Sequence, residues 1–487
     1  MNPYSRLIPR LNGREIEERF GYYLNLVEKG VAGFIVFGGE LETVRARLAK
    51  LQAASHHPLI IASDLEQGLG QQIEGGTVFP PAMAIASALK SAQREEASSM
   101  LEKIYTAFAK EAEYAGINTI LAPVLDINTN PDNPIIATRA FGEDSDTVSL
   151  FGCEMIKVLQ QNGIAACGKH FPGHGDTEID SHISLPVIKK DLDSLEHNEL
   201  VPFKRAIDEG VGMIMLGHLS VPALDPTGRP ASLSGRAASY LRDRMGFRGL
   251  IITDAMNMGG IGRYTENEAS LMALNAGVDI ILHPSDPDST ASYLQQKDYF
   301  ISKSTFLSFP GLTGESRKAL DARLGTSGMT CKEIDFGRHQ RLSDELAEMA
   351  VTVEGNIDLK ITKPFMIILK EDKVEKGEHF VNALKQRYAG FQYLSIFPGD
   401  DIPWSAIPKD HDLIVSVFSQ VKAWKGQTAA GVQRAIETLD GRAKIFISFG
   451  NPYVLRNARN TARIYAYWDS RSAQKAVAEK LSLRRTA

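Results

Sequence analysis

The stretch from His170 to Leu185 concentrates side chains that can transfer protons. It reads HFPGHGDTEIDSHISL and follows Lys169 directly. Its titratable side chains belong to His170, His174, Asp176, Glu178, Asp180 and His182. Imidazoles titrate near neutral pH, and the Gly and Pro residues of this stretch allow the backbone to bend. This composition is typical of a mobile loop that performs acid–base chemistry.

Two acidic residues stand out as candidates for that chemistry. Asp180 precedes His182 by two positions, so its carboxylate can orient the imidazole and compensate its charge. Further along the chain, residues 250–261 (LIITDAMNMGGI) predict an apolar strand that ends at Asp254. The carboxylate of Asp254 could act chemically or could cap the following helix.

Three interpretations of the histidines and acids remain open from these residues alone. Zinc or manganese could bind them, but a Gly- and Pro-rich loop holds metal ligands poorly, and no rigid HxH pair is present. Acid–base chemistry by Asp180 and His182 is the second interpretation. Structural hydrogen bonding is the third; it explains any single histidine more readily than all three together.

The elements that must position these groups follow a regular plan up to about residue 285. Short apolar runs alternate with amphipathic stretches, which predicts repeated strand–loop–helix units. The predicted strands are Leu7–Leu11, Gly33–Gly38, Leu59–Asp64, Thr119–Asp126, Ala165–His170, Gly212–His218, Leu250–Asp254 and Val278–His283. Eight such units predict a (β/α)8 TIM barrel, with a doubly wound sheet as the alternative.

The positions of the polar residues favour the barrel. Carboxylates, imidazoles and an ammonium group lie at the predicted carboxyl ends of six strands, and in a barrel those ends converge on one site. These residues are Asp64, Asp126, Lys169, His170, His218, Asp254 and His283.

A second region follows the barrel units. We predict a TIM-barrel catalytic domain over residues 1–310, a largely helical connection over 311–354 and a smaller α/β sandwich domain over 355–487, with a parallel sheet. The strands predicted in this last domain are 365–369, 393–397, 413–418, 445–449 and 464–468. Its loops lack a polar cluster like that of the first region, so a packing or substrate-gating role is expected.

Composition narrows the range of partners. The 487 residues carry a formal net charge of −5 and no run of Lys or Arg, which argues against nucleic acid or an anionic membrane surface as partner. The three cysteines are scattered and form no CxxC pair, and the N-terminus lacks the apolar core of a signal peptide. We therefore expect a cytoplasmic protein with reduced thiols and no membrane-spanning segment.

Four segments together resemble a known enzyme family. They are KHFPGHGDTEIDSH, TNPDNPIIATRAFGED, MIMLGHLSVPALDP and GFRGLIITDAMNMGGI, and the likeness extends in order from about Arg10 to Pro284. This part of the chain is similar to family 3 glycoside hydrolases of the bacterial β-N-acetylhexosaminidase type. The first domain of that family is a TIM barrel.

The resemblance implies a retaining mechanism without a cofactor or metal. Asp254 matches the family's nucleophile, which would attack the anomeric carbon to form a covalent glycosyl-enzyme. His182 would be the acid/base, and Asp180 would hold its imidazole in one tautomer. The triplet Asp180–Ser181–His182 takes the place of the second carboxylate that glycosidases generally use.

The resemblance also implies residues that bind the sugar. The positions that would hold the hydroxyl and acetamido groups of N-acetylglucosamine (GlcNAc) are Asp64, Arg139, Lys169 and His170. His174 and Asp176 would shape the loop, while His218 and Asp126 would support the floor of the site. Gln72 departs from the pattern, since many members have an arginine there that touches the substrate.

The resulting hypothesis is a retaining exo-β-N-acetylglucosaminidase. It would release terminal non-reducing GlcNAc from peptidoglycan-derived fragments, with a small carbohydrate as its partner. Three alternatives stay open: a β-N-acetylglucosaminide phosphorylase, a metal-dependent TIM-barrel hydrolase, and a non-catalytic sugar-binding protein on the same fold. The intact Asp254, Asp180 and His182 argue against the last of these.

Overall fold

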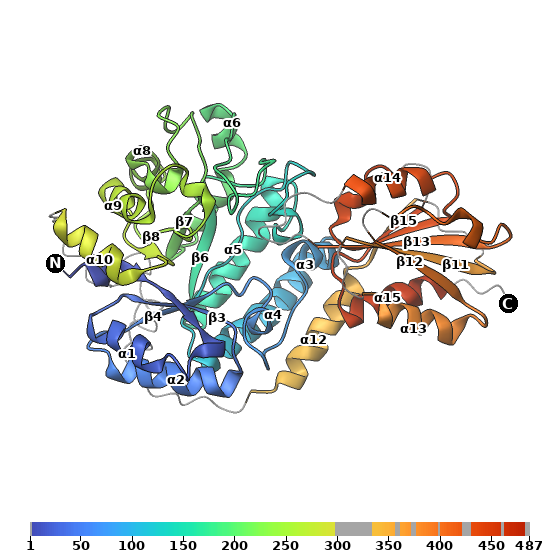
Figure 1. Ribbon diagram of the computed structural model, residues 1–487, viewed down its shortest axis with the longest axis horizontal. Coiled ribbons are helices and arrows are strands. Elements are labelled where there is room, and N and C mark those ends of the chain that lie inside the picture. The colour runs from blue at the N-terminus through green and yellow to red at the C-terminus, as the bar shows by residue number, and fades with distance from the viewer. Residues whose placement is uncertain are drawn as a thin grey trace. The chain divides into compact units, whose positions relative to one another are not determined.

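The computed structural model describes residues 2–297, 334–355, 361–371, 376–397, 400–420, 430–458 and 462–482. Contacts along the chain divide it into two compact units (Figure 1). The first unit comprises Met1–Val78, Arg94–Asn130 and Ala140–Gln340, and the second comprises Phe79–Gln93, Pro131–Arg139 and Arg341–Ala487. The boundary expected between residues 310 and 311 lies outside the described residues, so the domain limits stay a prediction. Cys331 also lies outside the described residues.

The first unit is built on a curled parallel sheet. Seven strands lie in the order β2-β3-β4-β5-β6-β7-β8, and β1 pairs with β9 in parallel. A doubly wound sheet would reverse this order at its middle, so the observed order favours the curled sheet over that alternative. The strands are β1 Leu7–Ile8, β2 Arg10–Asn12, β3 Gly33–Phe37, β4 Ile60–Ser63, β5 Thr119–Ile120, β6 Ala165–Phe171, β7 Met213–Leu216, β8 Leu250–Thr253 and β9 Ile281–Leu282.

Each predicted strand segment of the first unit contains an observed strand, but one is much shorter than expected. The segment 119–126 was predicted as one strand, whereas β5 covers only Thr119–Ile120. Pro123 lies in its middle and has no N–H to donate to a neighbouring strand. Beyond it, the segment is tied to β6 through an isolated parallel bridge between Val124 and Lys169.

Helices connect the strands of the first unit, and their ends follow local sequence signals. Thr265 and Glu268 form a capping box at the start of α9, and Gly277 ends that helix with a φ of 98°. The helices are α1 Phe20–Glu28, α2 Leu41–Ala54, α4 Arg94–Ala115, α5 Ser145–Gln161, α6 Leu192–His197, α7 Val201–Asp208, α8 Gly235–Ser239, α9 Glu266–Ala276 and α10 Pro287–Gln296. No helix in these ranges, or elsewhere in the described chain, is long and apolar enough to cross a membrane.

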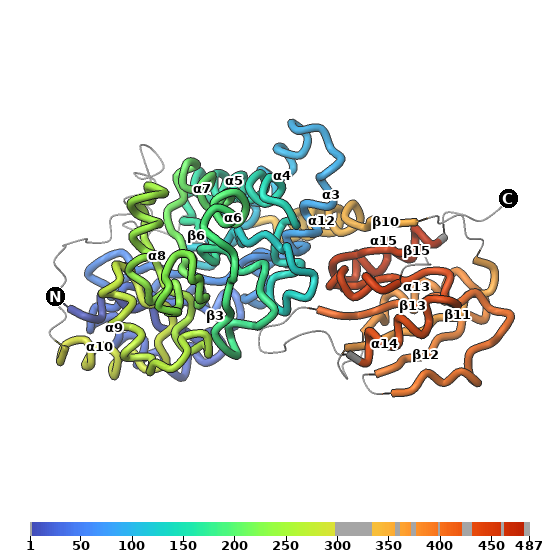
Figure 2. The backbone as a smooth tube through the Cα atoms, turned by 90° about the horizontal axis from the view of Figure 1, so that it is seen from above, coloured from blue at the N-terminus to red at the C-terminus, as the bar shows by residue number. Residues whose placement is uncertain are grey.

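The second unit holds a six-stranded sheet with the order β10-β15-β14-β13-β11-β12. Five strands are parallel, as predicted, and Figure 2 shows β11, β12 and β13 side by side. The strands are β10 Thr352–Glu354, β11 Pro364–Lys370, β12 Gln392–Ile396, β13 Asp412–Ser419, β14 Ile445–Gly450 and β15 Ala462–Tyr465.

The sixth strand, β10, corrects an expectation. It runs antiparallel to β15 and occupies the end of the segment predicted as a helical connection. The β-branched Thr352 and Val353 favour an extended backbone there. The described residues of that segment also include the helix α12, Phe336–Met349.

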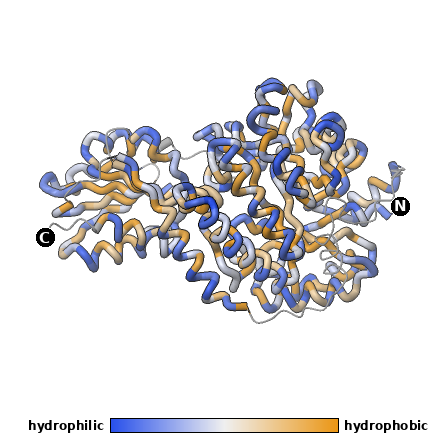
Figure 3. Tube along the Cα trace, turned by 180° about the vertical axis from the view of Figure 1, so that it is seen from behind, coloured by the Kyte–Doolittle hydropathy of each residue, from blue (hydrophilic) through white to orange (hydrophobic). Residues whose placement is uncertain are grey.

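Helices cover both faces of the second sheet. Buried side chains of α13 (Glu378–Arg387) and α15 (Arg471–Ser482) share a core with one face, while those of α14 (Ala430–Leu439) share a core with the other. The same unit includes α3, Ala82–Leu89. Figure 3 shows hydrophobic residues along the strands of this sheet, as expected where both faces are covered.

Candidate active site

The strands of the first unit enclose an apolar core. Charged and aromatic side chains lie two positions after several of the core residues. Side chains alternate along a strand, so the residue two positions after a core residue faces the same way. The core includes Ile8, Ile35, Ala62, Cys167 and Ile252. Two positions further along the chain stand Arg10, Phe37, Asp64, Lys169 and Asp254. We call these five residues the end layer. Phe37, Asp64, Lys169 and Asp254 lie at or near the carboxyl ends of β3, β4, β6 and β8, whereas Arg10 follows the carboxyl end of β1 and begins β2.

The charges of the end layer converge. The Cys167 thiol is buried, and burial raises its pKa; the charges of Lys169, Asp64 and Asp254 all act on it as well. Three residues that are far apart in the sequence therefore lie close enough to one core side chain for their charges to act on it.

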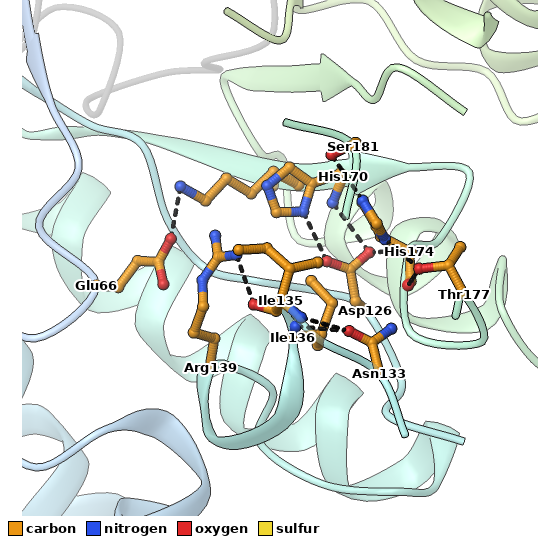
Figure 4. A network of polar contacts seen from close by, with 12 residues as sticks. Glu66, Asp126, Asn133, Ile135, Ile136, Arg139, His170, His174, Thr177 and Ser181 are labelled. Atoms are coloured by element: carbon orange, nitrogen blue, oxygen red, sulfur yellow. Dashed lines mark hydrogen bonds and ion pairs between the residues drawn. The ribbon is translucent and has the colours of Figure 1, made fainter. Parts of the chain in front are cut away.

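Lys169 forms a buried ion-pair cluster. Its Nζ lies 2.7 Å from Oδ1 of Asp64. It also lies 2.7 Å from Oε1 of Glu66, which is labelled in Figure 4. The Lys169 side chain is 3% exposed, and a buried ammonium requires such partners. Sequence reasoning found Asp64 and Lys169 but missed Glu66, although it stands only two positions after Asp64. Together the two carboxylates fix the Lys169 ammonium at the end of β6.

His170 and Asp126 form a second buried pair. Oδ2 of Asp126 lies 2.7 Å from Nδ1 of His170, and its Oδ1 accepts the backbone N–H groups of His170 and His174. Burial alone would raise the pKa of Asp126, but the neighbouring His170 and these hydrogen bonds lower it overall. The carboxylate thus stays ionised and holds the His170 ring in position, which agrees with the supporting role predicted for Asp126.

His174 is fully enclosed by hydrogen bonds within the loop. The Thr177 hydroxyl donates to the carbonyl of His174, so Nδ1 of His174 donates to that hydroxyl oxygen at 2.8 Å. Nε2 then accepts from the Ser181 hydroxyl at 2.9 Å. Burial, and then the charge of His170, lowers the pKa of His174 to about 4. A neutral imidazole with both nitrogens engaged shapes the loop, as the sequence predicted.

His182 and Asp180 form the pair that the loop sequence predicted. Oδ1 of Asp180 accepts both the backbone N–H of His182, at 2.9 Å, and its Nδ1, at 2.7 Å. The Asp180 side chain is 0% exposed, whereas that of His182 is 22% exposed. The carboxylate therefore fixes the tautomer and orientation of an imidazole that reaches solvent.

Asp254 follows β8 and is almost completely buried. Its Oδ1 accepts the backbone N–H of Ala255 at 2.8 Å. Burial would raise the pKa of Asp254, but its electrostatic interactions with His170, His218 and His182 lower it overall. Asp254 is thus an ionised carboxylate with three imidazoles close enough to act on its charge. Within the described part of the chain, Asp254 accepts from the N–H of the next residue, Ala255, and not from the first turn of a helix.

The turn after Asp254 is hydrogen-bonded to the loop that contains Ser181 and His182. The N–H groups of Gly259 and Gly260 donate to the carbonyl oxygens of His182 and Ser181, at 3.1 and 2.8 Å. The candidate acid/base loop is therefore attached to the same turn that follows Asp254.

The two remaining histidines at strand ends make fixed contacts. Nε2 of His218 donates to the carbonyl of Ala255 at 3.0 Å, and its Nδ1 accepts from the Ser232 hydroxyl at 2.7 Å. Burial lowers the pKa of His218. Nδ1 of His283 donates to Oδ1 of Asn257 at 2.8 Å. These contacts tie His218 to the segment around Asp254, and its role in supporting the floor of the site stays a prediction.

Arg139 and Gln72 are the remaining residues that the sequence analysis connected with the substrate. Arg139 belongs to the second unit, where its Nη1 donates to the carbonyl of Ile135 at 2.9 Å (Figure 4). Gln72 ends the short 3-10 helix Leu69–Gln71. Sugar binding by Arg139 and an effect of Gln72 on the substrate stay predictions. Within the ranges that the structure describes, His, Cys, Asp and Glu side chains form no group of three or more that could hold a metal ion.

A comparison with known protein families shows to which family the chain belongs. Residues 23–300, more than half of the chain, match the glycosyl hydrolase family 3 N-terminal domain. The chain therefore belongs to glycosyl hydrolase family 3.

Three similar proteins are named as a beta-hexosaminidase or a beta-N-acetylglucosaminidase. The chain is 32% identical over 334 residues to beta-hexosaminidase A of Pseudoalteromonas piscicida, covering 63% of this chain and 55% of that protein. It is 35% identical over 270 residues to a beta-hexosaminidase of Chromobacterium violaceum, covering 54% of this chain and 74% of the relative. A solved family 3 beta-N-acetylglucosaminidase from Paenibacillus sp. str. FPU-7 has a TM-score of 0.76 at 26% identity, covering 99% of this chain and 96% of that one.

Proposed function

We propose that this protein is a retaining exo-β-N-acetylglucosaminidase with Asp254 as nucleophile and His182 as acid/base. The observation that supports the assignment most is the attachment of the His182 loop, through Gly259 and Gly260, to the turn that follows Asp254. The names of the relatives support GlcNAc as the sugar released.

The first step would form a covalent intermediate. Oδ1 of Asp254 accepts from Ala255, so Oδ2 would attack the anomeric carbon while the bond from that carbon to the leaving oxygen breaks. Nδ1 of His182 is bound to Asp180, so Nε2 would deliver the proton to the leaving oxygen. The ionised Asp180 would stabilise the imidazolium that must be present before this transfer.

The second step would release the sugar. Nε2 of His182 would take a proton from water, whose oxygen attacks the anomeric carbon as the ester bond to Asp254 breaks. Asp254 leaves as the carboxylate that its environment favours. The sugar itself would be held by Lys169, His170 and Asp64, whose charged hydrogen bonds suit hydroxyl and acetamido groups, with Arg139 as a further predicted contact.

We also propose that the curled sheet closes into a complete (β/α)8 barrel. An isolated parallel bridge joins Ile252 in β8 to Ile280, just before β9. Strand β9 pairs with β1, and only Pro9 separates β1 from β2. These contacts support a ring of strands. A peptidoglycan-derived substrate and a cytoplasmic location remain predictions from the sequence.

Azide trapping tests the two catalytic roles separately. With an activated aryl β-GlcNAc as substrate, we expect Asp254→Ala and His182→Ala each to lower kcat by roughly 10³-fold or more. Azide should give an α-glycosyl azide with Asp254→Ala, because it attacks in place of the nucleophile. It should give a β-glycosyl azide with His182→Ala, because it attacks the covalent intermediate.

Matched controls come from an exposed helix. Asp193→Ala and His197→Ala, in α6, should retain wild-type activity. An active Asp254→Ala enzyme, or the same azide product from both variants, would contradict the assignment. Parallel assays in phosphate and in phosphate-free buffer distinguish hydrolysis from phosphorolysis, since only phosphorolysis yields a sugar phosphate.

A further inference from the structure

Arg10 and Phe37 belong to the end layer but have no part in the proposed chemistry. The guanidinium carbon of Arg10 lies 5.1 Å from the centroid of the Phe37 ring, within the range of a cation–π contact. Arg10 is exposed, and Phe37 is half-buried. Neither residue lies in the four segments that carry the family resemblance most clearly, although both fall within the wider range of the likeness.

Two further residues extend this group. The His283 ring packs edge-to-face against Phe37, with ring centroids 6.0 Å apart, and its Nδ1 is bound to the exposed Asn257. Burial, and then the charge of Arg10, lowers the pKa of His283 to about 4, while the charge of Asp64 opposes this. The imidazole is therefore neutral near pH 7, and Arg10 supplies the positive charge of the group.

The charge of Arg10 is balanced differently from that of Lys169. Lys169 is buried and has two carboxylate partners, whereas no carboxylate in the described parts of the chain forms an ion pair with Arg10. Arg10 thus presents an exposed cation beside an aromatic face, at the same end of the sheet as Asp64 and Asp254. A guanidinium in this setting matches a carboxylate on a ligand.

We propose that Arg10, Phe37, Asn257 and His283 bind the leaving group of the substrate, and that they favour a leaving group with a carboxylate. This inference rests on the proposed glycosidase function. The terminal sugar would occupy the buried side of the end layer, against Lys169. The part of the substrate that projects into solvent is the leaving group, and it meets the exposed Arg10.

Two aryl glycosides that differ in one charge test the proposal. The substrates are β-GlcNAc linked to 4-nitrophenol and to 3-carboxy-4-nitrophenol, and the measured quantity is the ratio of their kcat/KM values, acidic over neutral. We expect the ratio to fall by about fivefold in Arg10→Gln, as for an exposed ion pair. The ratio should fall further in Arg10→Glu. Added salt should lower the ratio in the wild type and leave it nearly constant in Arg10→Gln.

Arg14→Gln is the matched control. Arg14 is an exposed arginine close to Arg10 in the sequence, is paired with Glu74 and lies outside the end layer. Its replacement should leave the ratio at the wild-type value. Equal thermal unfolding midpoints for Arg10→Gln and wild type would show that the variant remains folded.

The outcomes separate this inference from the function on which it rests. If both substrates are cleaved and Arg10→Gln leaves the ratio unchanged, the leaving-group site is wrong and the glycosidase assignment stands. An equal loss on both substrates would likewise assign Arg10 a role independent of the carboxylate and overturn the proposal. If the wild type cleaves neither glycoside, the proposed function itself is wrong and this inference falls with it.

Discussion

The backbone N–H of Gly259 donates to the carbonyl oxygen of His182, with 3.1 Å between the two heavy atoms. Gly260 makes the equivalent contact with Ser181 at 2.8 Å. The strand that delivers Asp254 is thereby connected, within six residues, to the loop that carries the candidate acid/base. We therefore expect the relative position of the two catalytic candidates to depend on these backbone contacts, which no side chain provides.

The first prediction concerns the close approach at Gly260. A Cβ atom at this position would lie 2.6 Å from Cβ of His218 and 2.8 Å from the carbonyl oxygen of Ser181. Gly260→Ala must therefore displace the loop or the His218 backbone. We expect kcat to fall by about 10²-fold, since an error of roughly 1 Å in a catalytic group has that cost. Steady-state kinetics on an aryl β-GlcNAc measure it.

Gly235→Ala provides the control for this substitution. A Cβ atom at Gly235 would have no neighbour closer than 3.8 Å, so this variant should keep wild-type kcat. A Gly260→Ala enzyme with normal kcat would show that the position of His182 does not depend on this turn.

The second prediction concerns motion of the loop. The Gly- and Pro-rich sequence predicts that residues 171–183 open to admit the sugar, so the contacts with Gly259 and Gly260 must break and reform. We expect the amides of Gly259 and Gly260 to exchange hydrogen more slowly when GlcNAc is bound. Hydrogen exchange read by mass spectrometry checks this. Identical protection of the loop and of this turn with and without GlcNAc would argue for a static loop.

The third prediction separates the charge of Asp180 from its geometry. Asp180→Asn keeps an oxygen that can accept from both the N–H and Nδ1 of His182, but it removes the negative charge. The imidazolium loses its stabilisation, so we expect kcat to fall by about 10²-fold or more. Asp180→Ala, which removes the oxygen as well, should be worse. Equal kcat in Asp180→Asn and wild type would limit Asp180 to orientation of the ring.

Several features of the fold could be predicted because strands and catalytic loops have strong local signals. The apolar runs that became β4, β6, β7 and β8 lead to charged or polar residues, and period-two alternation places those residues together. The His182–Asp180 contact follows from their spacing. The same alternation could have identified Arg10 and Phe37, since they follow Ile8 and Ile35 by two positions.

Other features depend on contacts that no local pattern specifies. Glu66 pairs with Lys169, which is more than a hundred positions away, so its role appears only once β4 and β6 lie in one sheet. The antiparallel pairing of Thr352–Glu354 is set by β15, again far along the chain. The attachment of His182 to Gly259 uses backbone atoms, for which residue type gives little indication.

The last prediction concerns stability in acid. His174 has a pKa of about 4 in the folded protein against 6.5 as its ordinary value. Between these values the unfolded chain binds more protons, so the free energy of unfolding rises with pH. The contribution of His174 is complete above about pH 6.5 and is lost as the pH falls to about 4. Its size is on the order of 3 kcal/mol, at about 1.4 kcal/mol for each unit of pKa difference.

His174→Gln tests this contribution, because a glutamine amide can donate to Thr177 and accept from Ser181 without titrating. The free energy of unfolding, measured with urea from pH 4 to pH 7.5, should depend less steeply on pH in this variant than in wild type. Some dependence will remain, since burial also lowers the pKa of His218. His56→Gln, at an exposed position, should leave the slope unchanged. Parallel curves for wild type and His174→Gln would mean that His174 is protonated in the folded protein as readily as in the unfolded chain.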